Sequence, residues 1–412
     1  MAERAEPVGT VVIGAGQAGL ANSYTLAQRG LDHVVLEHGR IGEAWRGRWD
    51  SLCMVLPNWY NGLPGFPYQG AAPDGFQTRD EWVADLARYA ATFALPVREG
   101  VAVSAVTALP DGRFSLRTSA GALAAENVVV ATGSYQASRV PAIAAELAHN
   151  IHQIHSGEYR NPDALPPGAV LIVGTGNSGS QIAEELHRAG RAVYLSVGSS
   201  GFPLRRYRGR DVFWWYVTAN LAHPSLRDGV SPAGFGNITG RDGGRALDLR
   251  RFSRDGIHLL GRIHAIDGAT IAIAPDLAAS LADIDRRTDA FRRAVDAHID
   301  ATGLDAPPDE PSPDAGLGGA DAPDSPATLD LRAAGITSVV WATGYGWDLA
   351  WLPLPVLDAV GAPRNVAGMS PCAGLYFAGM SAVDPLSTSI GRVGAEAERI
   401  AAAIAVRQSA GA

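Results

Sequence analysis

The feature that most constrains this chain is a glycine-rich turn that occurs twice, each time between a β-branched strand and a helix. The first copy is G-A-G-Q-A-G at residues 14–19, after VGTVVI and before LANSYTLAQRG. Gly14 permits a tight turn, Gly16 lets the backbone approach a pyrophosphate, and Gly19 lets the helix pack on the strand. The free N–H groups and the dipole at the helix start attract phosphates. This context predicts a dinucleotide site.

An acidic residue follows the first turn at the spacing that such a site requires. Glu37 ends the next predicted strand, HVVLE, at the distance from Gly14 at which an acid holds a ribose hydroxyl. Strand, helix and acid together favour a nucleotide site over a turn without function. Gln17 and Ala18, inside the turn, are predicted to contact the same cofactor.

The second copy, G-T-G-N-S-G, follows the apolar run AVLIV and lacks the acid. The equivalent ribose position lies near Ser196, and arginines follow it in RRYRGRD. Guanidinium groups match the geometry of a phosphate, so this pattern favours NADP(H), although the arginines could equally form a solvated basic loop. The residues predicted to bind the second nucleotide are Gly174, Gly176, Asn177, Ser178, Gly179, Arg205 and Arg206, with Arg208 close by in sequence.

Two nucleotide sites in one chain need different occupants. A flavin held at the first site and a nicotinamide visiting the second would suit hydride transfer. We therefore expect an α/β fold with two Rossmann-like domains, the NADP-binding domain being inserted into a split FAD-binding domain. The predicted FAD domain covers residues 1–165 and 329–412, the NADP domain covers 166–303, and a Pro/Asp/Gly-rich linker or loop covers 304–328.

Length and charge exclude several other classes of protein. The chain has 412 residues, enough for two cores, and a formal net charge of −8 with no long run of Lys or Arg. Electrostatics therefore gives no support for nucleic acid or a membrane surface as a partner. Neither a signal-type start nor an apolar run of about 18 residues occurs, so we expect a soluble, cytoplasmic protein.

The chain has only two cysteines, Cys53 and Cys372, which form no C-x-x-C pair. This argues against a disulfide framework and against zinc bound by cysteine, and no metal site is predicted. It also removes the redox-active dithiol that a flavin disulfide reductase normally needs.

Local patterns predict three further helices or helix ends. Thr78 and Glu81 form a capping-box pattern at the start of one helix, residues 279–302 carry apolar side chains at helical spacing, and a final helix is expected from about Val393. Residues 41–75, crowded with Trp, Tyr, Pro and Gly, predict a long ordered loop that lines a ligand.

The motifs GAGQAG, ATGSY, GTGNSG, HSGEYRNP and ATGYG occur in this order over nearly the whole chain. In this they resemble the class B flavin-dependent monooxygenases, in particular the YUCCA-like and bacterial flavin-containing branch. The resemblance implies that NADPH reduces FAD, that dioxygen then forms a C4a-(hydro)peroxyflavin, and that one oxygen atom is inserted into a small organic substrate while NADP⁺ remains bound. The implied partners are that substrate and dioxygen, and a homodimer is left open.

The identifying motif of this family, F-x-G-x-x-x-H-x-x-x-Y, is matched only in its second half. His155 and Tyr159 match, whereas His149 and Ile151 stand where Phe and Gly belong. Baeyer–Villiger members carry Trp in place of the Tyr, so N- or S-oxygenation or YUCCA-type oxidative decarboxylation is favoured. His155 taken alone is more typical of a hydrogen-bonded structural histidine.

The resemblance also suggests which residues surround the flavin. Trp45 would pack on the FAD, and Asn58 would reach the flavin and the peroxide as a catalytic residue, unless it has a core or turn role. Ser389 and Gly391 would start the last helix and face flavin N1 and the C2 carbonyl, unless they only cap it. The remaining candidates for cofactor contact are Val103, Thr132, Gly133, Thr343, Gly344 and Gly379.

Three successive aromatic residues, Trp214, Trp215 and Tyr216, could cover the active site, contact a partner or belong to the core.

Two other functions use the same sequence features. The first is an NADPH oxidase or reductase that oxygenates no substrate. The second is a non-catalytic flavin or nucleotide sensor in which residues 304–328 bind a partner, although hydride-transfer equipment would then have no use.

Overall fold

The computed structural model describes residues 5–198, 201, 203–218, 237–309, 323–380 and 389–411. The chain forms two compact units. Unit 1 comprises Met1–Gly47, Asn58–Ser138 and Tyr345–Ala412, and unit 2 comprises Arg48–Pro57 and Arg139–Gly344. The main part of the second unit is thus inserted into the first, as predicted.

The predicted domain boundaries differ from the observed ones. Residues 139–165 and 329–344 belong to unit 2, because the strands that they contain, β8 (His152–His155) and β19 (Ile336–Trp341), pair in the sheet of the second unit. Strand pairing between segments nearly 200 residues apart leaves no local pattern in sequence. Of the predicted linker 304–328, residues 310–322 lie outside the described residues, and Thr328 already belongs to strand β18.

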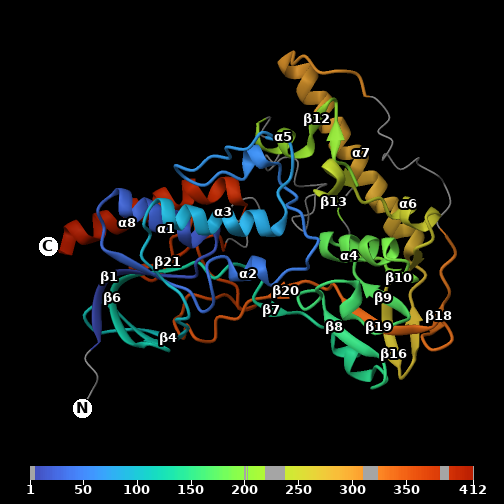
Figure 1. Cartoon of the computed structure of the whole chain (residues 1–412), viewed down its shortest axis with the longest axis horizontal. Coiled ribbons are helices and arrows are strands. Elements are labelled where there is room, and N and C mark those ends of the chain that lie inside the picture. The colour runs from blue at the N-terminus through green and yellow to red at the C-terminus, as the bar shows by residue number, and fades with distance from the viewer. Residues whose placement is uncertain are drawn as a thin grey trace. The chain divides into compact units, whose positions relative to one another are not determined.

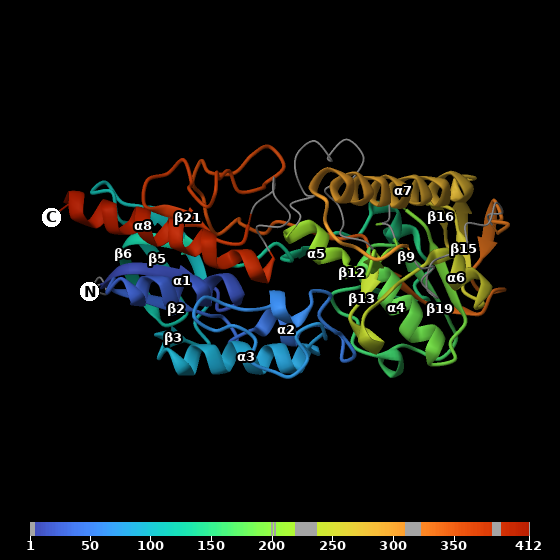
Figure 2. The same ribbon diagram turned by 90° about the horizontal axis from the view of Figure 1, so that it is seen from above.

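Unit 1 contains a seven-stranded mixed sheet in the order β3-β2-β1-β6-β5-β4, with β21 paired to β6. The strands β1, β2, β3, β6 and β21 run parallel, whereas β4 and β5 form an antiparallel extension on β6. Helices α1, α3 and α8 lie over one face of this sheet (Figure 1, Figure 2). The elements of unit 1 are β1 (Glu6–Ile13), α1 (Gln17–Gln28), β2 (His33–Leu36), α2 (Glu43–Arg46), the 3-10 turn η1 (Asn58–Tyr60), α3 (Arg79–Thr92), β3 (Val97–Arg98), β4 (Val103–Ala108), β5 (Phe114–Thr118), β6 (Gly121–Val130), β7 (Ala137–Ser138), β20 (Tyr345–Gly346), β21 (Leu375–Phe377), the 3-10 turn η6 (Ile390–Arg392) and α8 (Val393–Gly411).

Unit 2 contains a five-stranded parallel sheet in the order β15-β10-β9-β19-β8. Helix α4 follows β9 and α6 leads into β15, and both lie on one face of the sheet (Figure 1), while Ile271 of β17 joins Leu171 and Trp341 in the core on the other face. The other elements of unit 2 are η2 (Ala142–Glu146), η3 (Pro162–Ala164), β9 (Ala169–Val173), α4 (Asn177–Arg188), β10 (Val193–Ser196), β11 (Arg206–Tyr207), β12 (Arg210–Asp211), α5 (Val212–Val217), β13 (Ile238–Thr239), η5 (Arg241–Gly243), β14 (Arg245–Ala246), α6 (Leu249–Arg254), β15 (His258–Leu260), β16 (Ile263–Asp267), β17 (Thr270–Ile273), α7 (Leu277–Thr302) and β18 (Thr328–Asp330).

The two units therefore repeat one plan, strand, glycine turn, helix and parallel strand. The predicted α/β fold with two Rossmann-like units is confirmed. The amphipathic helix predicted at 279–302 is α7, and the predicted final helix is α8. Residues 41–75 are mostly irregular and contain only the short α2 and η1.

The start of α3 gives a test of local stability. Glu81 N donates to Thr78 Oγ1 at 3.3 Å, and Thr78 N donates to Glu81 Oε2 at 2.7 Å, so the predicted capping box is formed. We expect Thr78→Ala to lower the free energy of unfolding by about 1 kcal/mol, because a helix N–H loses its acceptor. This can be measured by urea unfolding, with tryptophan fluorescence as the probe of the transition. Thr78→Ser, which retains the hydroxyl, should stay close to the unaltered protein, and equal losses in both variants would contradict the prediction.

Candidate functional site

The first glycine turn has the shape that a pyrophosphate needs. Gly14 has φ +107°, and a Cβ there would lie 2.7 Å from Ala131 O, while a Cβ on Gly19 would overlap Gly14 O. Both glycines are therefore required by the backbone. A Cβ on Gly16 would instead meet no atom within 4 Å, so this glycine borders open space. The turn fits the approach of a phosphate group at Gly16.

The electrostatics of the first turn also fit a dinucleotide. Helix α1 begins after Gly16 with no side-chain cap and no acid in its first turn, so its dipole and N–H groups face no negative side chain there. Glu37 is 4% exposed, and its carboxylate accepts from Ala15 N at 2.8 Å and Gly39 N at 3.0 Å. The acid thus lies beside the turn, where a ribose would be held.

Several other predicted cofactor residues of unit 1 lie at the same edge of the sheet. Trp45 Nε1 donates to Gln17 Oε1 at 3.0 Å, which fixes the indole beside the start of α1. A Cβ on Gly379, which follows β21, would come 2.9 Å from the Ala18 Cβ. Thr132 and Gly133 follow β6, and Thr132 Oγ1 accepts from Gln136 Nε2 at 2.8 Å. Strands β1, β6 and β21 are parallel neighbours, so these residues share the carboxyl edge of the sheet, where open α/β folds bind their ligands.

The structure gives Asn58 a role in holding a turn. Its Nδ2 donates to Ala72 O at 2.9 Å, and its Oδ1 accepts from Gln77 N at 2.9 Å, so both ends of the amide hold the loop 72–77. The side chain is buried, with 3% exposed. The second Nδ2 hydrogen is not used by the bond to Ala72, and the catalytic role of Asn58 stays a prediction.

The segment at the start of α8 lies against η1, the 3-10 turn that contains Asn58. Tyr60 and Ser389 share a hydrogen bond of 3.1 Å between their hydroxyl oxygens, and a Cβ on Gly391 would come 2.6 Å from the Tyr60 ring. Ser389 forms no side-chain cap with the turn that precedes α8. The structure therefore brings η1 and the predicted flavin-facing helix start together, and Tyr60 is a contact that the sequence patterns did not indicate.

Val103 is placed away from the acid of the first site. It begins β4 and pairs with Thr118, whereas the backbone of Val101 donates to Glu37 O at 2.8 Å. The backbone of Val101 therefore contacts the predicted ribose acid, and the cofactor contact of Val103 stays a prediction.

The second glycine turn repeats the geometry of the first. Gly174 has φ +107° with Ala342 O nearby, a Cβ on Gly179 would overlap Gly174 O, and a Cβ on Gly176 would meet nothing within 4 Å. Helix α4 likewise starts without a side-chain cap or an acid in its first turn, which contains Asn177 and Ser178. This turn also fits a dinucleotide.

Thr343 and Gly344, which were predicted to belong to the FAD domain, lie in unit 2. They follow β19, and Ala342, the residue before them, contacts Gly174. The second A-T-G turn thus stands beside the second glycine turn as the first A-T-G turn stands beside Gly14. The error has the same cause as the boundary error, namely the pairing of β19 with β9.

The predicted phosphate-binding arginines have partners within the protein. Arg205 is 3% exposed, forms an ion pair with Asp211 at 2.8 Å and donates to Val55 O at 2.7 Å. Burial lowers the pKa of Arg205 to about 10, which leaves it charged near neutral pH. Arg206 donates to the carbonyls of Gly243 and Gly244 at 3.0 and 3.1 Å.

Arg208 forms an ion pair with Asp296 at 2.9 Å. All three arginines thus have acceptors within the protein, although Arg206 is exposed to solvent and Arg205 is buried.

The partly matched family motif forms a structural connection. His155 is 2% exposed, its Nδ1 accepts from Gly157 N at 3.1 Å, and its Nε2 lies 2.9 Å from Gly344 O. Because Nδ1 accepts, Nε2 must carry the proton and donate to Gly344. Burial lowers the pKa of His155, which favours the neutral ring. Both ring nitrogens are thus used in hydrogen bonds to the backbone, as expected for a structural histidine.

The departures from the motif also have a physical account. Ile151, in the Gly position, is 4% exposed and belongs to the apolar core of unit 2, whereas His149, in the Phe position, is exposed. Tyr159 is buried and donates to Glu185 of α4 at 3.0 Å.

The aromatic run belongs mainly to the core. Trp215 is fully buried and donates to Tyr207 O at 2.9 Å, and Tyr216 is 5% exposed. Trp214 lies beneath Arg210, whose guanidinium carbon is 3.9 Å from a ring centroid.

Comparisons with known proteins identify the family. The model of the pyridine nucleotide-disulphide oxidoreductase family matches residues 11–207. The oxidoreductase CzcO-like of Geobacillus kaustophilus is 33% identical over 398 residues, which are 95% of this chain and 96% of that protein. The chain belongs to the CzcO-like oxidoreductases.

More distant relatives connect this CzcO-like chain to monooxygenases. The indole-3-pyruvate monooxygenase YUCCA1 of rice is 34% identical over 202 residues, 48% of this chain and 50% of that one. The fold is similar to that of a flavin-containing monooxygenase from Stenotrophomonas maltophilia, with a TM-score of 0.65, 20% identity, and coverage of 98% and 99% of the two chains. The predicted relationship to flavin-dependent monooxygenases of the flavin-containing and YUCCA type is confirmed, and it implies a flavin and a nicotinamide cofactor.

Two further findings concern only the part of this CzcO-like chain that the structure describes. No helix there is long and apolar enough to cross a membrane. No three side chains of the His, Cys, Asp or Glu type gather there as metal ligands.

Neutral His155 should make stability depend on pH. The unfolded chain takes up a proton near the ordinary imidazole pKa of 6.5, whereas the folded chain resists it, so the stabilising contribution is full above this pH and lost as pH falls. We expect the free energy of unfolding to fall less between about pH 7.5 and about pH 5.5 in His155→Gln than in the unaltered protein. Urea unfolding at both pH values measures this. An equal pH dependence in the two proteins would show that His155 titrates normally in the fold.

Proposed function

We propose that this protein is an NADPH-dependent flavoprotein monooxygenase that inserts one atom of dioxygen into a small organic substrate. FAD would occupy the first turn and NADP(H) the second. The observation that carries the proposal is the repetition, in one chain, of two turns with the same open glycine, the same required glycines and the same uncapped helix start. Oxygenation of N or S atoms, or oxidative decarboxylation as in YUCCA enzymes, is favoured over Baeyer–Villiger chemistry because Tyr159 replaces Trp.

The residues of unit 1 would bind and shield the flavin. The N–H groups of Gln17, Ala18 and Gly19 would bind its pyrophosphate and Glu37 its ribose. Trp45, held by Gln17, would pack beside the cofactor, and the Asn58–Tyr60 turn together with Ser389 would border its reactive part. Bound FAD would supply the capacity to accept a hydride and to react with dioxygen.

The residues of unit 2 would bind the nicotinamide nucleotide. The N–H groups of Asn177, Ser178 and Gly179 would bind its pyrophosphate, with Thr343 and Gly344 at the same edge. Gly174 N donates to Ser196 O as Gly14 N donates to Leu36 O, so the residue equivalent to Glu37 is Val197, which carries no charge. The hydroxyl of Ser196, one residue earlier, donates to Gly261 O at 2.9 Å. The absence of a carboxylate at this position supports NADPH, because an acid there would repel a 2′-phosphate.

The alternative is an NADPH oxidase or reductase without substrate oxygenation. Both cofactor sites serve it equally well. A dithiol reductase is disfavoured, because the chain carries only Cys53 and Cys372, both present as free thiols.

The two open glycines give a matched pair of variants. Gly16 and Gly176 have φ −83° and −68°, which Val can adopt, and a Cβ meets no protein atom at either position. We expect Gly16→Val to fold but to lose bound FAD, because its methyl groups occupy the phosphate space. Gly176→Val should keep FAD and lose reduction by NADPH. Flavin absorbance, circular dichroism and anaerobic reduction rates measure this, and a Gly16→Val protein with full flavin content would refute the first assignment.

The reaction itself needs an isotope experiment. NADPH should reduce the flavin at least about tenfold faster than NADH at equal concentration, because a charged phosphate contact adds binding energy. The reduced protein, mixed with ¹⁸O₂ and a panel of amines, thioethers, ketones and aryl-pyruvates, should yield a product with one labelled oxygen. Equal rates with both coenzymes would contradict the NADPH assignment. Stoichiometric hydrogen peroxide without product across the panel would establish the oxidase.

A further inference from the structure

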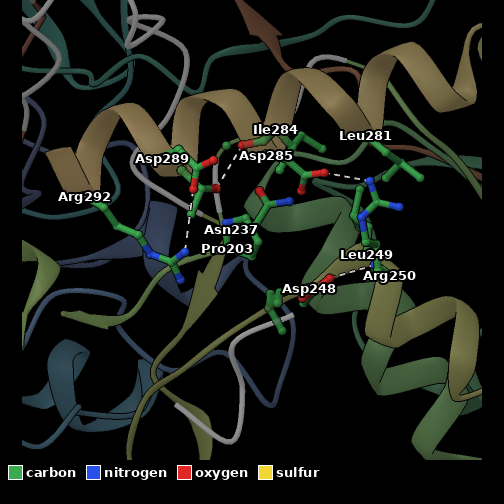
Figure 3. Close-up of a pocket in the computed structure, with 13 residues that line it drawn as sticks. Pro203, Asn237, Asp248, Leu249, Arg250, Leu281, Ile284, Asp285, Asp289 and Arg292 are labelled. Atoms are coloured by element: carbon green, nitrogen blue, oxygen red, sulfur yellow. Dashed lines mark hydrogen bonds and ion pairs between the residues drawn. The ribbon is translucent and has the colours of Figure 1, made fainter. Parts of the chain in front are cut away.

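Unit 2 contains a cavity of about 180 Å³ between α7 and the start of α6. Figure 3 shows its walls, which combine aliphatic side chains with charged ones. The aliphatic side chains are Leu247, Leu249, Leu281 and Ile284. Pockets for whole ligands usually measure about 300–1,000 Å³, so this one fits part of a ligand, such as a base or a sugar phosphate.

The cavity lies at the ligand-binding edge of the second sheet. Gly201 and Pro203, which follow β10, line it, and so does Asn237, whose Nδ2 donates to Ser180 Oγ in the first turn of α4 at 3.4 Å. The start of α6, which leads into the parallel neighbour β15, lines the same cavity as Gly201 and Pro203 and so lies near the carboxyl end of β10. In a Rossmann unit the adenosine ribose is held beyond the second strand, which here is β10.

Arg250, a cationic side chain in the wall of this cavity, has two N–H groups without hydrogen-bond acceptors among the described residues. Arg250 Nη2 forms an ion pair with Asp285 Oδ2 at 2.7 Å, and Figure 3 shows the side chain reaching from α6 toward α7. Its Nε and Nη1 are buried and have no hydrogen-bond partner among the described residues. A guanidinium left in this state on a cavity wall is poised for an anionic oxygen.

The carboxylates of the cavity already have partners. Asp248 Oδ1 accepts from the backbone N–H groups of Arg250 at 2.7 Å and Arg251 at 3.3 Å. Asp285 is paired with Arg250, and Asp289 lies 3.7 Å from Arg292. The unmet hydrogen-bonding capacity of this wall therefore includes the Nε and Nη1 donors of Arg250.

We propose that this cavity receives the adenosine end of the nicotinamide coenzyme and that Arg250 contacts its 2′-phosphate. This inference rests on the proposed function. In it Arg250, rather than Arg205 and Arg206, determines the choice of coenzyme. Those two side chains are held by Asp211, Val55 and the carbonyls after β13.

Binding of coenzyme fragments tests this without catalysis. Titration calorimetry of the flavin-loaded protein with 2′,5′-ADP and with 5′-AMP should show tighter binding of 2′,5′-ADP. Arg250→Gln should reduce this preference by roughly ten- to hundredfold and leave 5′-AMP binding nearly unchanged. A variant that kept the full preference would overturn the assignment.

Three control variants separate this contact from charge and folding effects. Asp285→Asn breaks the same ion pair but keeps the guanidinium, so the preference should be kept or increased. If Arg250→Gln fails to fold, a preference that is kept or increased in Asp285→Asn supports the proposal, and a lost preference overturns it. Arg254→Gln, on the exposed side of α6, and Arg206→Ala should both keep the preference, and its loss in Arg206→Ala alone would return the role to the arginines after β10.

Failure of this inference can be distinguished from failure of the proposed function. Rapid flavin reduction by NADPH together with equal binding of 2′,5′-ADP and 5′-AMP would reject the Arg250 contact and leave the enzyme assignment intact. A preference that depends on Arg250, found with no flavin reduction by either coenzyme, would support the contact and reject the oxidoreductase mechanism.

Discussion

The contact on which both candidate sites depend is the close approach of a helix to the strand that precedes it. In each unit the third glycine of the turn packs its bare backbone on the carbonyl of the first, where any Cβ would overlap that oxygen. This contact holds the helix start directly behind the turn, so that the N–H groups and dipole of α1 and α4 are aimed at the open second glycine. No acidic side chain occupies either first turn, so the attraction for a phosphate is not cancelled within the protein.

Those parts of the structure that depend on neighbours in sequence could be predicted. The two glycine turns, the Thr78–Glu81 capping box and α7 are determined by steric limits, by one hydrogen-bond pair and by apolar spacing, all within one or a few helical turns. The position of Glu37 could also be predicted, because β2 runs parallel to β1 and therefore ends beside the first glycine turn. For these features the local preference and the final fold agree.

The domain boundaries and the surroundings of several predicted site residues depend on contacts between distant segments, which the sequence does not show. The pairing of β8 and β19 with the second sheet moved Thr343 and Gly344 to unit 2, and the β3 connection put Val101, rather than Val103, beside Glu37. Arg205 and Arg206 look like phosphate ligands in sequence, but their acceptors are Asp211 and backbone carbonyls that composition cannot reveal. Charge patterns predict that a cation is present, and only packing shows whether it already has a partner.

Arg205 is one of the residues whose contacts attach a short piece of the first segment to unit 2. Residues Arg48–Pro57 are grouped with that unit, and Arg205 donates to Val55 O within this piece while its Nε pairs with Asp211. Burial disfavours both charges: it raises the pKa of Asp211 and lowers that of Arg205. The attraction between the two side chains opposes this effect and stabilises both charged forms. Removing one member of such a pair leaves an uncompensated buried charge and typically costs about 3–5 kcal/mol. Loss of coenzyme selectivity on mutation of Arg205 would therefore report disturbed packing of this segment. Coenzyme choice is better tested at a side chain such as Arg250, whose Nε and Nη1 have no hydrogen-bond partner among the described residues.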